Sequence, residues 1–217
     1  MDAFSDVLVD KFSSELGRRS LSQDMVSGLL FNGAIIPEGL ETNKAYRLAS
    51  LEDAEALGIN VAYDVDGQSA YYQIQQYFRL NPLGDLFIMA LVNDNSYEDT
   101  IRCAKAFQEA VNGEIRQMAI IFSNETTFQQ TKDAVQVAQE QVDMAYADYM
   151  PFEVLLEGKG FAAVLAAGVS EVDDLAELGA SNVSVVVAMD VTAAITYPNT
   201  AAVGMALGAV SRAKVSE

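Results

Sequence analysis

The segment "LFIMALV" at residues 86–92 decides the fold, because it is an apolar run with no polar break. Such a run is typical of a strand that is buried on both faces. The next segment, "SYEDTIRCAKAFQEAVNG" at 96–113, has apolar residues at helical spacing and ends on a glycine. A second apolar run, "QMAIIF" at 117–122, follows it. This order of strand, helix and strand predicts a parallel sheet with helices on its faces.

The same alternation continues along the chain. A long amphipathic pattern predicts a helix over 127–149, and "FEVLLEG" predicts a strand at 152–158. We expect a short helix at 170–179, a further strand at 183–190, and a final helix from about Pro198. Strands and helices therefore alternate along most of the chain, as they do in an α/β domain.

The first 80 residues have a different pattern. "VSGLLFNGAII" and "KAYRLAS" predict strands, "SLEDAEALG" a short helix capped by Ser50, and "SAYYQIQQYFRL" a helix with aromatic residues for packing. We predict an α/β fold with a mostly parallel or mixed central sheet flanked by helices, to which this strand-rich portion is added. Residues 1–24 are expected to form an N-terminal extended arm or edge strand, and 25–217 a single α/β domain.

The composition excludes several classes of function. Acidic residues outnumber basic ones by 31 to 13, so the surface repels nucleic acid and anionic lipid. The chain has no histidine and one cysteine, Cys103, which excludes Ser-His-Asp and Cys-His catalysis, His-ligated zinc and CxxC sites. The N-terminus lacks the features of a signal peptide. We expect an intracellular protein that is not an enzyme and needs no cofactor or metal.

One motif, "VAYDVDGQ" at 61–68, points to an enzyme instead. It resembles the nucleophile loop of haloacid-dehalogenase-type phosphatases, in which the first aspartate attacks phosphorus and the second is an acid or base. Asp64 and Asp66 would take these roles, with Lys159 as a phosphate partner. That family, however, places the motif close to the N-terminus. We favour an acidic turn before a helix.

The segment "AAVGMALGAVS" predicts a final helix that is apolar on two sides. Gly204 and Gly208 lie one turn apart, a spacing that lets another backbone approach closely. This helix is either a core helix or one whose second face is covered by a further part of the chain or by a neighbouring subunit. We predict subunit contacts at these two glycines and along the alternating N-terminal segment, at the positions Val7, Val9, Phe12, Gly204 and Gly208.

Three segments, in order along the chain, resemble the sheath proteins of contractile phage tails. They are "GLLFNGAIIPEG…NKAYRLASLEDAEALGI", "YYQIQQYFRLNPLGDLFIMAL" and "AAVGMALGAVSRAKVSE". The similarity is to the Mu-like sheath group and its relatives in Bacteroidetes, and it extends from about Ser27 to Glu217. Its motifs are structural rather than catalytic.

The resemblance implies a structural function. Sheath subunits stack in rings around an inner tube and contract when the baseplate triggers them, which drives the tube through a cell envelope. Subunits join through extended arms that add strands to neighbouring sheets. The expected partners are copies of the chain in a ring or helical lattice, an inner tube protein and a baseplate, with no nucleic acid and no membrane insertion. The expected location is the bacterial cytoplasm during assembly, then a virion tail or injection particle.

Members of the sheath group continue past the last helix into further structure and a C-terminal arm, and we expect this arm to be absent here. Two other functions stay open beside the sheath. One is the phosphatase that uses Asp64 and Asp66, and the other is a non-catalytic oligomeric α/β binding module.

Overall fold

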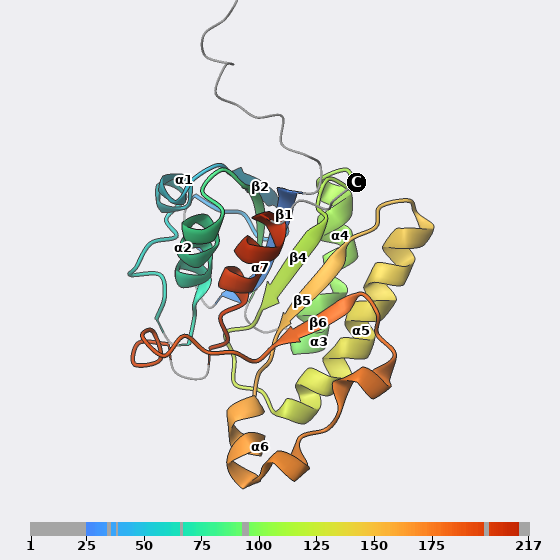
Figure 1. The fold of residues 1–217 in the computed structure, drawn as a ribbon. Coiled ribbons are helices and arrows are strands. Elements are labelled where there is room, and N and C mark those ends of the chain that lie inside the picture. The colour runs from blue at the N-terminus through green and yellow to red at the C-terminus, as the bar shows by residue number, and fades with distance from the viewer. Residues whose placement is uncertain are drawn as a thin grey trace, which may run out of the picture.

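A computed structural model describes residues 25–33, 36–37, 39–65, 67–92, 96–197 and 200–212 (Figure 1). The strands are β1 (Val26–Gly33), β2 (Ala45–Leu48), β3 (Asp85–Val92), β4 (Gln117–Ile121), β5 (Glu153–Glu157) and β6 (Val183–Val186). The α-helices are α1 (Leu51–Ala56), α2 (Ala70–Leu80), α3 (Tyr97–Arg102), α4 (Ala104–Ala110), α5 (Phe128–Ala147), α6 (Phe161–Ala167) and α7 (Val203–Arg212).

The strands form one mixed sheet in the order β2-β3-β1-β4-β5-β6. All neighbouring pairs are parallel except β2 and β3, which are antiparallel. Within the parallel part, β1 is flanked by β3 and β4, so the chain moves outward from β1 first to one side and then to the other. This is the strand order of one class of doubly wound sheet. The predicted α/β fold with a mostly parallel or mixed sheet is confirmed.

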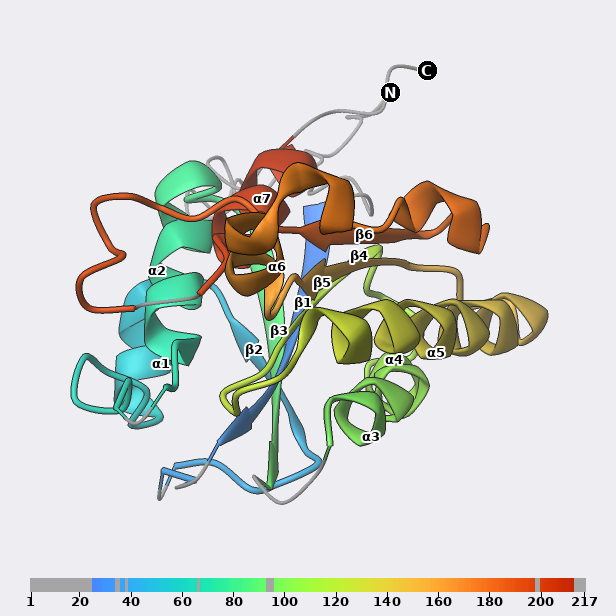
Figure 2. The ribbon, with the colours of Figure 1, turned by 90° about the horizontal axis from the view of Figure 1, so that it is seen from below.

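Helices cover both faces of the sheet (Figure 2). On one face, α1, α2 and α7 lie over a core that includes Leu29, Ile88 and Leu155. On the other, α3, α4 and α5 lie over a core that includes Leu30 and Met89. Successive residues of a strand point to opposite faces, so a central strand must be apolar at nearly every position. The continuous apolar runs in the sequence have this origin.

The predicted helix starts are formed by side-chain caps. Ser50, Ser96 and Thr127 each accept a hydrogen bond from the backbone three residues on, and the side chain at that third position bonds back to the cap. These reciprocal capping boxes satisfy backbone N–H groups that the first turn leaves unpaired. The helix expected within 96–113 is divided at Cys103 into α3 and α4.

The helices α2 and α7 pack against each other at very short range. A Cβ atom on Gly204 would lie 2.1 Å from the carbonyl oxygen of Gln73, and one on Gly208 would lie 2.8 Å from that of Tyr77. The Gln73 side chain also accepts a hydrogen bond from the Gly204 N–H (2.6 Å) and donates one to the Ala201 carbonyl (2.8 Å). Glycine is therefore required at 204 because any side chain would enter the backbone of α2.

Two predictions about helices in the last third of the chain are wrong. The short α-helix predicted at 170–179 is instead two 3-10 turns, Val169–Glu171 and Leu175–Leu178. Asp174 accepts a hydrogen bond from the Ala176 N–H, and such local bonding competes with a continuous helix. The final helix begins at Val203 rather than near Pro198, because Ala201 is still extended and pairs with Met189. The helix α6 was not predicted.

Candidate functional site

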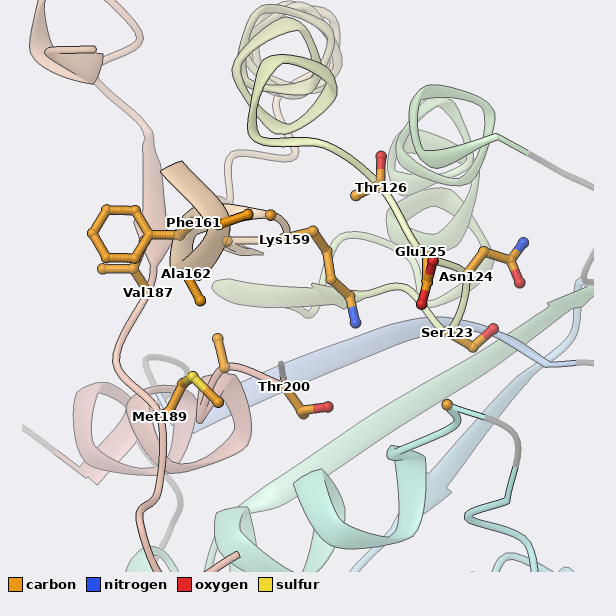
Figure 3. Close-up of a pocket in the computed structure, with 15 residues that line it drawn as sticks. Ser123, Asn124, Glu125, Thr126, Lys159, Phe161, Ala162, Val187, Met189 and Thr200 are labelled. Carbon is orange, nitrogen blue, oxygen red and sulfur yellow. The ribbon is translucent and has the colours of Figure 1, made fainter. Parts of the chain in front are cut away.

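A cavity of about 400 Å³ lies at the carboxyl ends of β4 and β5. Its walls come from the segment 123–126 after β4, the segment 158–163 after β5, and residues that precede α7 (Figure 3). The place beside it, where β1 and β4 lie next to each other, is the switch point of the sheet. Ligands of doubly wound sheets bind in this region, which makes the cavity the first candidate for a site.

Glu157 is the last residue of β5 and is fully buried next to the cavity. Its carboxylate accepts hydrogen bonds from the N–H groups of Phe122 (3.0 Å) and Ala201 (3.3 Å), and lies 3.1 Å from the Lys159 ammonium. Burial raises the pKa of Glu157, and the nearby Lys159 charge opposes that rise. The side chain thus joins the ends of β4 and β5 to the segment that leads into α7.

Lys159 lies two residues after Glu157, and its side chain extends into the middle of the cavity (Figure 3). It is 8% exposed. The Lys159 carbonyl accepts a hydrogen bond from the Thr131 hydroxyl (3.0 Å), which fixes this loop to α5. Gly160 follows in the left-handed conformation, at φ 69°, and a Cβ there would lie 2.3 Å from the Phe128 nitrogen. The glycine lets the loop pass close to α5 and keeps Lys159 in place.

The other wall of the cavity is fixed to the central strand. The Ser123 N–H donates a hydrogen bond to the side-chain oxygen of Asn32 on β1 (2.8 Å). Thr127 then caps α5, so the segment between β4 and α5 is held at both ends. Glu125 lies in this segment as an exposed residue of the cavity lining. Both of these loops are therefore anchored, one to β1 and the other to α5.

Asp64 has a structural role at the start of α2. One of its carboxylate oxygens accepts from the Tyr71 N–H (2.9 Å), and the other accepts from the Tyr72 N–H (2.8 Å). Burial raises the pKa of Asp64, and these backbone bonds oppose the rise. Asp64 is not among the described residues that line the Lys159 cavity. Asp66, its partner in the phosphatase alternative, lies outside the described residues.

Two further residues with reactive or charged side chains, Cys103 and Asp190, have local partners. Cys103 is half-buried, and burial followed by the Asp99 charge raises the pKa of its thiol, which favours the protonated form. Asp190 accepts hydrogen bonds from the backbone and hydroxyl of Thr192, and these bonds lower the pKa of its carboxyl. Across the described ranges, no group of three or more Cys, Asp or Glu side chains is placed to hold a metal ion.

The predicted subunit-contact residues fall into two groups. Val7, Val9 and Phe12 lie outside the described residues. Gly204 and Gly208 are buried against α2 of the same chain, so a subunit that contacts α7 would have to use another face of this helix.

The sequence singled out Lys159 as a phosphate partner, and Glu157, with which it pairs in the structure, was not predicted. The residues needed to find the pair are in the segment "EVLLEGKG", where an acidic residue ends an apolar strand and a lysine follows two positions later. An acidic side chain at the end of a buried strand needs a partner, since a buried unpaired charge is unfavourable. That reasoning would have paired Glu157 with Lys159.

Comparisons with known proteins add a family to this description. In the part of the chain that the structure describes, no helix combines the length and the apolar composition needed to cross a membrane. A search of curated proteins found no match to the chain. Residues 4–217, nearly the whole chain, match the family described as DUF2586, N-terminal domain. The chain therefore belongs to the DUF2586 family.

Proposed function

We propose that this protein is a subunit of a contractile tail sheath, of a phage tail or a related injection system. In this proposal the subunits assemble around an inner tube in the bacterial cytoplasm. In the finished virion tail or injection particle, the sheath then contracts and drives the tube through a cell envelope. Its partners are further copies of the chain, the inner tube protein and the baseplate.

One observation carries the proposal. The three segments that resemble sheath proteins supply β1, β2, α1, α2, β3 and α7, and the last of them follows more than 100 residues after the second. Among these elements, β1 and β3 are neighbouring strands, and α2 and α7 are helices that pack together. The resemblance therefore includes residues that determine one another's packing, such as Gly204 and Gln73. A chance similarity of short segments has no reason to select such a unit.

The edge of the sheet at β6 supports the proposed mode of assembly. Within the described residues, β5 is the one strand that pairs with β6. β6 reads "VSVV", with no charged residue and no proline, although exposed edges usually carry such residues to prevent pairing with other chains. An apolar hollow of about 530 Å³, lined in part by Val183 and Val185, lies beside this strand. These features fit an edge that receives a strand from a neighbouring subunit.

The first test is electron microscopy of the full gene product mixed with its inner tube protein. We expect hollow cylinders or stacked rings. Monodisperse small particles under all assembly conditions would count against a sheath and would favour the oligomeric binding module.

The second test examines the β6 edge with a pair of variants. The Val154 N–H bonds to the Asn182 carbonyl and the Gly158 N–H to the Val186 carbonyl. In a parallel pair this pattern places the Val185 N–H on the open side of β6. Val185→Pro removes that N–H and should prevent assembly while the monomer stays folded by circular dichroism. Val185→Thr keeps the N–H and should assemble. Normal assembly of the proline variant would exclude the β6 edge as the joining site.

A further inference from the structure

The Lys159 cavity has a charged group directed into it that the proposed sheath function does not use. A lysine residue that is 8% exposed is unusual, because an ammonium group loses its hydration when it is buried. The described part of the chain offers this ammonium one partner, the Glu157 carboxylate at 3.1 Å. An ammonium group has three N–H donors, so donors remain for a molecule in the cavity.

The charges around the cavity restrict what can bind there. Lys159 and Glu157 have opposite formal charges, and Glu125 adds a negative charge at the exposed rim. A doubly charged anion such as phosphate would be repelled by both carboxylates, and Lys159 is the one cation among the described lining residues that offsets this. A singly charged acceptor satisfies the free donors of Lys159 at a smaller electrostatic cost.

The walls of the cavity differ in polarity. Ala162, Val187 and Met189 form an apolar side, whereas Ser123 lies on the other side of the lysine and Thr200 lies beside Met189 (Figure 3). A volume of about 400 Å³ suits a small molecule. The complementary ligand is small, with one anionic end and one apolar end.

We propose that this cavity binds a small monocarboxylic acid. The carboxylate accepts hydrogen bonds from the Lys159 ammonium, and the apolar part of the acid lies against Ala162, Val187 and Met189. This site is independent of the sheath proposal, because it depends only on the cavity and its buried ion pair. The sheath proposal can fail without affecting it, and the reverse also holds.

The test compares benzoate with benzamide, which has the same ring and no charge, by NMR titration of the full chain. The signals observed are the backbone amides of Gly158 and Gly160 and the methyl group of Met189. We expect saturable shifts with benzoate, with a Kd on the order of 10 mM or tighter for a ligand of this size. Benzamide should bind roughly tenfold more weakly, because its hydrogen bond is not between charged groups. Inorganic phosphate should also bind more weakly than benzoate.

Three variants locate the binding. The double variant Lys159→Met with Glu157→Gln removes both charges together and should abolish the benzoate shifts. Lys132→Met makes the same lysine change on α5 at a half-buried position that does not line the cavity, and should leave them unchanged. Glu125→Gln should tighten benzoate binding severalfold at low salt, because it removes a repelling charge at the rim.

Equal affinity of the unmodified chain for benzoate and benzamide would overturn the proposal, and so would shifts confined to residues away from the cavity. Both measurements use the unmodified chain, so they test the proposal even if the double variant does not fold. A chain that shows no saturable shift with benzoate at the cavity amides would refute it as well.

Discussion

Replacement of Gly204 by alanine should separate α7 from α2. The new Cβ would lie 2.1 Å from the Gln73 carbonyl oxygen, whereas carbon–oxygen contacts stay near ~3.3 Å, so the helices must move apart by about 1 Å. That movement stretches both hydrogen bonds of the Gln73 side chain, now 2.6 and 2.8 Å long, beyond bonding distance.

The size of the effect follows from opposing contributions. Two lost buried hydrogen bonds cost about 2 kcal/mol together, and strain in a packed core adds ~1–3 kcal/mol. Alanine returns about 1 kcal/mol because it favours helix more than glycine does. The net loss in the free energy of unfolding is therefore about 2–4 kcal/mol. For a chain of this length each kcal/mol lowers Tm by ~2–4 °C.

Urea denaturation followed by circular dichroism measures this loss. Ala209→Gly is the matched control, because it exchanges the same two residues at an exposed position of the same helix. The control should lose about 1 kcal/mol from helix propensity alone. A Gly204→Ala variant as stable as the unmodified chain would refute the close packing of α2 and α7.

Three further predictions test other parts of the structure. Asp64→Ala should destabilise the protein by ~1–2 kcal/mol, because it removes the acceptors for two N–H groups of α2, and Asp64→Asn should destabilise it less. Urea denaturation would detect this ranking. If neither variant lost stability, the capping role of Asp64 would be contradicted. Lys159→Met and Glu157→Gln should each lower the free energy of unfolding by ~3–5 kcal/mol, because each leaves one member of the buried ion pair without its partner. The double variant should lose less than the sum of the two single losses. Additive losses in this double-mutant cycle would show that the two groups are not coupled. Hydrogen bonds from Ser96 lower the pKa of Asp99, so the contribution of Asp99 to stability is present above the ordinary aspartate pKa and is lost as pH falls through the pKa of the folded state. The difference in the free energy of unfolding between the unmodified chain and Asp99→Asn should therefore shrink from pH 6 to pH 2. A difference that stays constant over this range would contradict the prediction.

Much of the fold could be predicted because its signals are local. The apolar run at β3 and the serine and threonine caps of α1, α3 and α5 act within a few residues of themselves. The segment after β5 could not be predicted in the same way. Gly158 and Gly160 are residues typical of a turn, but α6 follows because the loop fits against α5, and that is a tertiary contact.

The candidate site was harder to predict than the fold. Its parts come from the ends of β4 and β5 and from the segment before α7, and no single motif contains them. The motif that attracted attention, with Asp64, resembles a catalytic loop because acidic turns and catalytic aspartates use the same residues. The hydrogen bonds that Asp64 accepts from the Tyr71 and Tyr72 N–H groups support the acidic turn, and the sequence alone does not reveal them.

The contact between α2 and α7 has a consequence for how the protein is made. A ribosome releases α2 about 130 residues before α7, as the separation of Gln73 from Gly204 shows. During that interval one apolar face of the central strands lacks its last covering helix. Such long-range closure is slow, and the uncovered face is prone to aggregate until translation has passed Arg212. The nascent chain should therefore depend on chaperones late in its synthesis rather than early.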